Sequence, residues 1–222
     1  MKSIHPTAII ENGAKIGSNV EIGPFCHIGP EVIIGNSCKL KSHVFLDGQT
    51  TIGEENIFFP TSYIGGEPQD LKFNNEKSQV LIGSRNTFRE GVSVHRGTRG
   101  GGGKTVIGNN CLLMISSHVA HDCLIGNDVV IANSVQIAGH VVVEDRAVIG
   151  GCLGIHQFVH IGYLAMVGGM TRVDRDVPPY CLAEGHPGRM RGLNKVGIKR
   201  KNIDKDHREE YLQLKRIWNL LF

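Results

Sequence analysis

The sequence of 222 residues predicts an all-β solenoid, in which short strands wind around a thin apolar interior. The main observation is an aliphatic residue at every sixth position, with a small or slender side chain four residues after it. A helix buries residues at a period near 3.6 and a strand at a period of 2, so neither alone produces a period of six. A composition with 29 glycines and only 6% aromatic residues also fits a narrow, repetitive interior.

Three such sides close one coil of about eighteen residues, and residues one coil apart then stack in columns at a strand spacing of ~4.8 Å. The strictest stretch, from Ile107 to Val177, carries twelve hexads in register. Eleven more run from Ile4 to Ile64, and three lie between the two stretches. Together they predict eight or nine coils.

Glycine often follows the inward aliphatic residue in the N-terminal stretch. We interpret these glycines as corner residues, because glycine tolerates the positive backbone dihedral angle that a corner demands. The positions concerned are Gly17, Gly23, Gly29, Gly35, Gly53 and Gly65.

Two interruptions predict loops that project from the solenoid. Asp70 and Glu76 fall on positions that would face the interior, where a carboxylate is costly, so a loop is expected at about 65–80. A gap between Val94 and Ile107 predicts the second loop, at about 95–106. Loops on a rigid scaffold commonly carry functional residues.

The glycine-rich part of the second loop does not match a phosphate-binding loop. Thr98 stands where that motif needs a glycine before Gly103-Lys104-Thr105, and no strand-to-helix context surrounds it. A flexible surface loop is the favoured interpretation.

The chain lacks signs of secretion or of a membrane span. No apolar segment follows Met1-Lys2-Ser3, and no apolar run approaches the ~20 residues that span a bilayer. Cys26, Cys38, Cys111 and Cys123 fall on the small inward position of the hexad, where a thiol packs as a small hydrophobic group. We expect reduced cysteines and a cytoplasmic protein.

The C-terminal part differs in composition from the coils. Residues 186–222 contain ten Lys/Arg and four Asp/Glu, whereas the formal charge of the whole chain is +3, so the tail is basic and the body mildly acidic. Apolar residues from Asp204 onward lie near helical spacing. We divide the chain into a solenoid domain, 1–185, and a basic, partly helical segment, 186–222. The favoured role of this segment is a cap on the open end of the solenoid, and a partner-binding helix is the alternative.

The densest ionisable chemistry lies in the segment His118-Val119-Ala120-His121-Asp122. Because Val119 faces inward, the two histidines and the aspartate lie at the surface or at a corner. His140 is one coil plus one residue after His121, so the two can be neighbours, and His156 follows in the next coil. A neutral imidazole oriented by a carboxylate is a suitable general base. The alternative is that these residues simply occupy solvent-facing positions, since the chain has 11 histidines.

At these residues the chain resembles the UDP-N-acetylglucosamine O-acyltransferases of lipid A biosynthesis, which are hexapeptide-repeat acyltransferases. The hexad by itself is shared by many acyltransferases, but the Gln-Asp-Leu-Lys loop together with His-x-x-His-Asp is specific. The matching segments are His5-Pro6-Thr7-Ala8-Ile9, Gln69-Asp70-Leu71-Lys72, His95-Arg96-Gly97-Thr98, His118-Val119-Ala120-His121-Asp122-Cys123, Ala138-Gly139-His140, Ile155-His156-Gln157-Phe158 and Asp176-Val177-Pro178-Pro179-Tyr180.

The resemblance implies a left-handed parallel β-helix and a transfer reaction. A 3-hydroxyacyl chain would pass from acyl carrier protein to the glucosamine 3-position of UDP-N-acetylglucosamine, without an acyl-enzyme. By similarity His121 is the general base, Asp122 orients it, and the Gly139 N–H meets the oxyanion. Substrate-binding residues carried over in the same way are Gln69, Asp70, Lys72, His118, His140, His156, Gln157, Asn194 and Arg200. Met166 and Gly169 would border the acyl groove.

The resemblance also implies partners: acyl carrier protein, a UDP-sugar and two further copies of the chain in a homotrimer. No metal, cofactor, nucleic acid or membrane insertion is expected, apart from the phosphopantetheine that the acyl donor carries. Three departures affect nucleotide specificity and carrier docking. The family usually has Glu at Gly66 and an acidic residue at Val196, and relatives continue beyond Phe222.

Other functions remain open from the sequence. The acceptor could be a different sugar nucleotide, in particular an amino sugar. A zinc carbonic anhydrase-like trimer could use His118 and His121 as ligands. A scaffold without catalysis would be indifferent to loss of His121.

Overall fold

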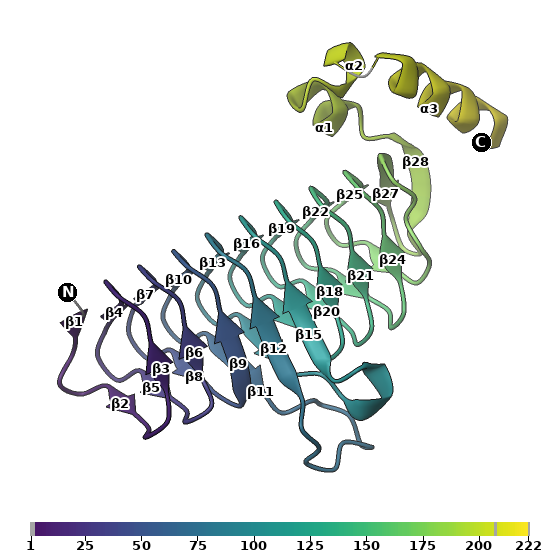
Figure 1. Ribbon diagram of the computed structural model, residues 1–222. Coiled ribbons are helices and arrows are strands. Elements are labelled where there is room, and N and C mark those ends of the chain that lie inside the picture. The colour runs from purple at the N-terminus through teal and green to yellow at the C-terminus, as the bar shows by residue number, and fades with distance from the viewer. Residues whose placement is uncertain (1–2, 207, 222) are drawn as a thin grey trace.

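The computed structural model describes residues 3–206 and 208–221, and these form a three-sided parallel solenoid with helices at its C-terminal end (Figure 1). Sheet A contains 11 strands, sheet B nine and sheet C eight, so eight complete coils are followed by a partial one. This agrees with the predicted eight or nine coils.

Neighbouring strands in each sheet come from successive coils and pair in parallel, with the exception of the last two strands of sheet A. In the middle of the solenoid the register links residues 18 apart, as in Leu112↔Val130↔Val148. The strands of sheet A are β1 (Ser3–Ile4), β4 (Glu21–Ile22), β7 (Lys39–Leu40), β10 (Ile57–Phe58), β13 (Thr87–Phe88), β16 (Leu112–Leu113), β19 (Val130–Ile131), β22 (Val148–Ile149), β25 (Met166–Val167), β27 (Cys181–Glu184) and β28 (Arg189–Leu193).

Sheets B and C form the other two faces of the prism. Sheet B consists of β2 (Ile9–Ile10), β5 (His27–Ile28), β8 (Phe45–Leu46), β11 (Tyr63–Gly66), β14 (Ser93–His95), β17 (His118–Val119), β20 (Gln136–Ile137), β23 (Gly154–Ile155) and β26 (Arg172–Val173). Sheet C consists of β3 (Lys15–Ile16), β6 (Ile33–Ile34), β9 (Gln49–Ile52), β12 (Gln79–Ile82), β15 (Lys104–Ile107), β18 (Leu124–Ile125), β21 (Val142–Val143) and β24 (His160–Ile161).

The core consists of the residues that the hexad predicts, except in the first coil, where no further coil covers the end of the solenoid and Ile4 is 42% exposed. Ile28, Leu46, Ile131 and Ile149 are fully buried, and the small positions such as Val129 also have no exposed surface. Each short strand contributes one inward side chain, so a column of aliphatic residues fills each side of the interior. Repetition of the same contact along the axis explains why the pattern is so strict.

The interpretation of the corner glycines is wrong for most of them. Gly17, Gly23, Gly29, Gly35 and Gly53 do not have positive φ, and Gly65 alone of the predicted set does, at 86°. The positive angle falls two residues later, for example on Asn19 and Ser37. The glycines are needed because neighbouring coils approach closely: a Cβ on Gly35 would lie 2.5 Å from the Gly53 carbonyl oxygen.

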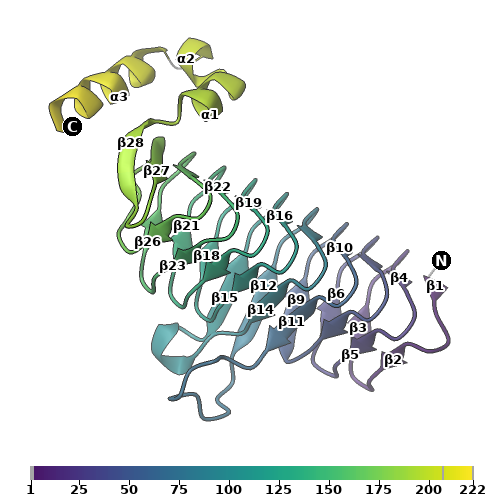
Figure 2. The same ribbon diagram turned by 180° about the vertical axis from the view of Figure 1, so that it is seen from behind.

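Both predicted loops are present but shorter than expected. β11 extends to Gly66 and β12 begins at Gln79, so the first loop comprises residues 67–78 instead of 65–80. The second comprises residues 96–103 instead of 95–106, because β14 includes His95 and β15 begins at Lys104. Parallel pairing of these longer strands with their neighbours recruits the flanking residues. The two loops project side by side from one edge of the solenoid (Figure 2).

The second loop is compact, in contrast to the flexible loop expected from its glycines. It contains the 3-10 helix η1 (Arg99–Gly101), and the Thr98 carbonyl accepts hydrogen bonds from the N–H groups of Gly101 and Gly103 at 3.1 and 2.7 Å.

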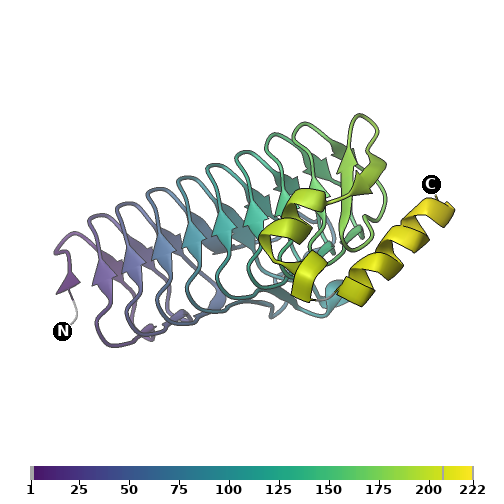
Figure 3. The same ribbon diagram turned by 90° about the horizontal axis from the view of Figure 1, so that it is seen from above.

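Three helices follow the antiparallel β27–β28 hairpin: α1 (Lys195–Arg200), α2 (Ile203–Asp206) and α3 (Arg208–Leu221). The predicted helix start at Asp204 falls inside α2, and the long helix begins later, at Arg208. The helices lie at the end of the solenoid, beside its last coils (Figure 3). A small apolar cluster joins them to the coils: Leu164, Leu193, Ile198 and Ile203, with Tyr163, Tyr180, Tyr211, Leu214 and Trp218 packed against it.

All six cysteines are free thiols, and the four that the hexad places inward are buried, as predicted. In the part of the chain that the structure describes, no helix has both the length and the apolar character needed to cross a membrane.

Candidate active site

One edge of the prism, where sheet B turns into sheet C, brings the predicted catalytic residues together. His121, Gly139 and Gln157 occupy the same corner position in three successive coils. Asp122, His140 and Phe158 occupy the next position, where φ is positive at 59°, 62° and 66°. The winding of the chain therefore brings together residues that are 18 or 19 positions apart in the sequence.

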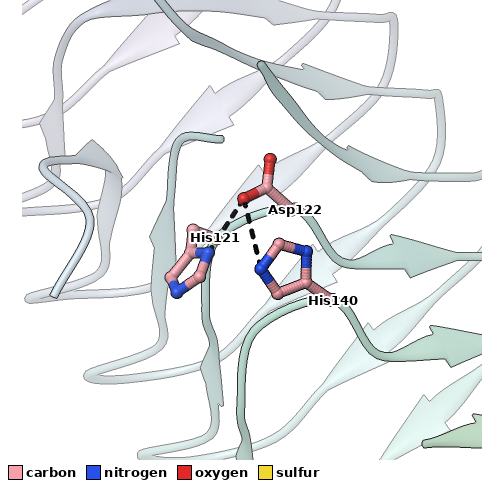
Figure 4. Close-up of side chains that lie close together, drawn as sticks. All are labelled: His121, Asp122 and His140. Atoms are coloured by element: carbon pink, nitrogen blue, oxygen red, sulfur yellow. Dashed lines mark hydrogen bonds and ion pairs between the residues drawn. The ribbon is translucent and has the colours of Figure 1, made fainter. Parts of the chain in front are cut away.

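His121 and Asp122 form a hydrogen-bonded pair at this corner (Figure 4). The distance from His121 Nδ1 to Asp122 Oδ2 is 2.9 Å, and both residues are buried. An ionised carboxylate only accepts hydrogen bonds, so the pair favours the tautomer with the proton on Nδ1. Nε2 is then an acceptor, and it has no hydrogen-bond partner among the described residues.

Asp122 is held from several sides. Oδ1 accepts the Thr98 N–H at 2.9 Å, and Oδ2 accepts the Thr98 hydroxyl at 2.6 Å. The Asp122 N–H donates to Thr105 Oγ1 at 2.9 Å. The carboxylate has no exposed surface, so these contacts replace the water that would otherwise solvate its charge.

His140 lies next to the pair without a direct hydrogen bond to it. Its Nε2 is 4.0 Å from Asp122 Oδ2, and its ring meets the His121 ring edge to face at 5.0 Å. On the other side it stacks on Phe158 with 4.5 Å between ring centroids. His140 thus confines the imidazole of His121 from the next coil.

A glycine is needed at position 139 because the His121 imidazole lies close to its Cα, and not because the backbone of the corner demands a glycine. Other corners carry Asn36, Asn109 and Asn127 at the same position, so a side chain is acceptable there. At Gly139 a Cβ would lie 2.7 Å from His121 Nε2. Within the described residues the Gly139 N–H donates to no protein acceptor, whereas the Asn127 N–H donates to Asp145 Oδ1 at 2.7 Å.

A pocket of about 590 Å³ lies on sheet B in front of this corner. Of the predicted residues it brings together His121, Gly139, His118, His156, Gln157 and Gln69. Other residues of its wall are Ala120, Gln136, Ile137, Ala138, Gly154, Ile155, Arg172, Val173 and Asp174. The single chain therefore brings the proposed base and Gly139, whose N–H has no protein acceptor among the described residues, to the wall of one cavity.

His118, which lines the pocket, is in contact with a second histidine, His95. His118 Nδ1 is 2.8 Å from Ser93 Oγ, and its ring meets the His95 ring at 4.7 Å between centroids. Burial lowers the pKa of His118, and burial lowers the pKa of His95 to about 4 with smaller effects from neighbouring charges. Both side chains are therefore neutral near pH 7.

A second cavity, of about 520 Å³, lies between the two loops and the same edge. It is lined by the predicted residues Asp70, Lys72 and His140, together with Asn74, Glu76, Thr98, Arg99, Gly100 and Phe158. The Glu76 carboxylate accepts the N–H groups of Asn74 and Arg99, and so links the loops. The predicted sugar-nucleotide residues are divided between the two cavities, on either side of the corner.

Four predicted residues lie elsewhere in the single chain. Met166 is on sheet A, and Gly169 follows it at the exposed corner between sheets A and B. Asn194 is buried and caps α1: its Oδ1 accepts the Gly197 N–H and its Nδ2 donates to the Leu164 carbonyl. Arg200 is exposed in the last turn of α1.

Sequence reasoning did not single out three residues that the site contains. Thr98 holds the Asp122 carboxylate, Gly101 packs against it, and Arg172 brings a cation to the pocket on sheet B. Thr98 belongs to the His-Arg-Gly-Thr segment that resembles the family, and this membership indicates a functional position. Its hydrogen-bond partner Asp122, however, is 24 positions away in the sequence. Only the winding of the chain brings the two together.

The glycine at position 66, where the family usually has Glu, is explained by its local surroundings. A Cβ there would lie 2.8 Å from Tyr63 Cε1 and 3.2 Å from His95 Cδ2, so a Glu would have to displace aromatic neighbours.

A metal site is disfavoured by the bonds that the corner residues already make. His121, Asp122 and His140 are the described group close enough to share an ion, with ligand atoms within 4.8 Å. Asp122, however, already accepts three hydrogen bonds from Thr98 and His121, and His121 Nδ1 is one of the donors. His118, a ligand in the carbonic anhydrase-like alternative, is not part of this group.

Two family models match the chain. One, described as UDP N-acetylglucosamine O-acyltransferase, domain 2, matches residues 176–222, and the bacterial transferase hexapeptide model matches residues 13–48 and 104–139. The acyl-[acyl-carrier-protein]–UDP-N-acetylglucosamine O-acyltransferase of Rhizobium johnstonii is 46% identical over 202 residues, which cover 91% of this chain and 74% of the relative. The protein of the same name from Rhizobium rhizogenes is 48% identical over the same share of each chain.

Solved structures agree with these relatives. LpxA from Acinetobacter baumannii is 45% identical with a TM-score of 0.88, covering 89% of this chain and 77% of that chain. The UDP-N-acetylglucosamine acyltransferase of Bacteroides fragilis is 40% identical with a TM-score of 0.91, covering 97% and 82%. The solenoid is a left-handed parallel β-helix, as predicted. By sequence identity, coverage and fold, the chain belongs to the UDP-N-acetylglucosamine O-acyltransferase family.

Proposed function

We propose that this protein transfers an acyl chain from acyl carrier protein to a hydroxyl of UDP-N-acetylglucosamine. Membership of the family supports the reaction class. The observation that carries the chemistry is the buried His121–Asp122 pair, whose imidazole lines the same cavity as Gly139. The finer assignment, a 3-hydroxyacyl chain placed on the glucosamine 3-hydroxyl as the first step of lipid A synthesis, follows the resemblance of the sequence.

The role of His121 is to remove the proton of the acceptor hydroxyl. A sugar hydroxyl is a weak nucleophile until it loses this proton, and Nε2 of the favoured tautomer can accept it. The oxygen then attacks the thioester carbonyl carbon. The Asp122 carboxylate stabilises the imidazolium that forms.

The tetrahedral intermediate carries a negative oxygen, and the Gly139 N–H supplies a donor for it. Collapse of the intermediate breaks the carbon–sulfur bond and leaves the ester on the sugar. The imidazolium of His121 returns its proton to the departing thiolate, so the base is regenerated. The reaction needs no cofactor of the protein, because the acyl donor carries its own phosphopantetheine.

Direct transfer is favoured over an acyl-enzyme because the nearby thiols are unreactive. Burial raises the pKa of Cys111 to about 11 and that of Cys123 to about 12. Both side chains point into the solenoid. A thiolate nucleophile would need a lower pKa and access to the cavity.

Substrate binding is assigned to the two cavities beside the corner. Lys72 offers a cation for the pyrophosphate, and Asp70, next to it in the loop, orders the loop by accepting the Lys72 N–H at 2.9 Å. His118, His156, Gln157 and Gln69 line the cavity on sheet B. An amino-sugar nucleotide remains the second candidate acceptor, since an amine attacks the thioester without prior deprotonation and His121 could take the proton that its nitrogen releases once the carbon–nitrogen bond forms.

We also propose a homotrimer with sites completed between subunits. In the middle and C-terminal coils, runs of outward residues on sheets A and C form apolar columns, whereas the outward residues of sheet B there are polar apart from Gly154. The column on sheet A contains Leu112, Val130, Val148, Met166 and Leu182, and that on sheet C contains Leu81, Val106, Leu124 and Val142. Two different faces that cover each other build a closed ring.

Such a ring gives the four distant residues a role. Met166 and Gly169 of one subunit can border the acyl chain bound at a neighbour, and Asn194 and Arg200 can approach its nucleotide. The acidic acyl carrier protein would dock on the basic C-terminal segment. With acyl carrier protein and a UDP-sugar as substrates, we expect the reaction to take place in the cytoplasm.

The test is an acyl-transfer assay with 3-hydroxyacyl carrier proteins of several lengths and a series of UDP-sugars. We expect transfer to UDP-N-acetylglucosamine by the unmodified protein and a loss of at least about 10³-fold in kcat for His121→Ala, since the base is removed. Undiminished transfer by His121→Ala would refute the catalytic assignment. Transfer only to an amino sugar would replace the acceptor.

A further inference from the structure

Thr98 is the residue around which the second loop folds. It is 5% exposed and precedes η1 with an extended backbone. Its carbonyl accepts the N–H groups of Gly101 and Gly103, which closes the loop into a compact turn. The N–H and hydroxyl of Thr98 are then directed away from the loop, toward Asp122.

Both of these donors reach the same carboxylate. The Thr98 N–H bonds Oδ1 at 2.9 Å and the hydroxyl bonds Oδ2 at 2.6 Å. Oδ2 also receives Nδ1–H of His121 at 2.9 Å. Hydrogen bonds to both oxygens restrict rotation of the Asp122 carboxylate about its Cβ–Cγ bond. Thr98 therefore sets the orientation of the carboxylate relative to His121. Bonds to charged acceptors are among the stronger hydrogen bonds in proteins.

We infer that Thr98 is a positioning residue for acyl transfer: by fixing the Asp122 carboxylate, it fixes the tautomer and the orientation of His121. This inference rests on the proposed function, because it concerns the base of that reaction. Thr98 takes no proton itself and acts through Asp122. The hydroxyl that matters is 24 residues from Asp122 in sequence and comes from a loop outside the coil.

The rest of the loop is shaped to keep this contact. Gly101 packs so closely on Asp122 that a Cβ would overlap the carboxylate carbon and oxygens. Arg99 N–H donates to Glu76 at 3.1 Å, which ties the turn to the loop that carries Asp70 and Lys72. The side chains predicted to bind the nucleotide are thereby linked to the orientation of the base.

The test compares three variants by steady-state kinetics of the full chain with acyl carrier protein and UDP-N-acetylglucosamine. Thr98→Val removes the hydroxyl and keeps the shape, and Thr98→Ser restores the hydroxyl. Thr50→Val is the matched control, since Thr50 is a buried threonine in β9 whose hydroxyl bonds the Asp47 carbonyl at 2.6 Å, away from the corner.

We expect kcat of Thr98→Val to fall about tenfold with KM for the sugar nucleotide within about threefold of the original, and Thr98→Ser to recover most of the loss. Thr50→Val should retain kcat. The inference is overturned if Thr98→Val keeps full kcat, if serine gives no rescue, or if Thr50→Val loses as much.

A second variant decides the question should Thr98→Val not fold. Gly101→Ala pushes a methyl group into the carboxylate without removing a donor, so kcat should fall while Thr98→Ser stays active. Full activity of Gly101→Ala would overturn the inference. No transfer by the unmodified protein would instead refute the proposed function, so the two failures are distinct.

Discussion

At the residue scale, the site depends on which residue occupies the corner position of each coil at the edge between sheets B and C. His121, Gly139 and Gln157 share one position in successive coils, and only the middle one is a glycine. The absent side chain at Gly139 leaves room for the imidazole of His121, and both residues line the same cavity. The site therefore depends on one corner that carries a glycine where equivalent corners carry a side chain.

This difference predicts a strong effect for Gly139→Ala. The added methyl would collide with the His121 ring, and a shift of about 1 Å at a reacting group costs on the order of 10²-fold in rate. We expect a fall in kcat of this size in the acyl-transfer assay, with little change in melting temperature.

The control is Gly151→Ala. Gly151 occupies the equivalent corner position between sheets A and B, where the nearest atom to a Cβ is the Asn133 carbonyl oxygen at 3.2 Å. Near-normal kcat for this variant is expected, and an equal loss in both would mean that corners in general reject a methyl group.

At the element scale, the strands β14 and β17 place the buried His95 and the half-buried His118 beside the site. His95 is 7% exposed, and its Nδ1 is buried with no hydrogen-bond partner among the described residues. Burial lowers its pKa to about 4. The folded protein therefore keeps His95 neutral in a range where the unfolded chain, with a histidine pKa of ~6.5, takes up a proton.

This shift predicts a loss of stability in acid. Because the unfolded state binds the extra proton, stability falls as pH decreases from about 6.5 toward 4, and the full contribution is present above 6.5. In His95→Gln this part of the pH dependence is absent. The difference between melting temperatures at pH 7.5 and pH 5 should be smaller for this variant than for the unmodified protein.

His5→Gln, at an exposed position near the N-terminus, is the control and should retain the original difference. An unchanged difference in His95→Gln would show that His95 does not contribute to the acid sensitivity.

At the scale of the whole molecule, the apolar columns on sheets A and C predict assembly. Leu124 is 43% exposed in the single chain and lies between Val106 and Val142 on sheet C. A charge in a buried interface has a high desolvation cost. Leu124→Asp should shift the protein from trimer toward monomer in light scattering coupled to gel filtration.

The same variant should lose activity if the sites lie between subunits, although Leu124 is not among the residues that line either cavity at the corner. A trimer that survives Leu124→Asp would exclude sheet C as the interface. A monomer with full kcat would show that one chain contains the complete site.

The sequence by itself determined the solenoid, its coil number and the identity of its inward residues, because a period of six admits few other structures. It also placed His121 beside His140, since stacking follows from a coil of about eighteen residues. It misjudged the corner glycines, because close approach between coils is a contact across the structure and not a property of the local backbone.

Only the tertiary structure decided how the site is held. The bond between Thr98 and Asp122 joins a projecting loop to a corner, and loop length has no fixed relation to the hexad register. The division of the nucleotide residues between two cavities, and the distance of Met166 and Arg200 from both, likewise depend on which face of the prism each residue occupies. A periodic pattern encodes position within a coil, whereas contacts made by loops and tails depend on the path of the whole chain.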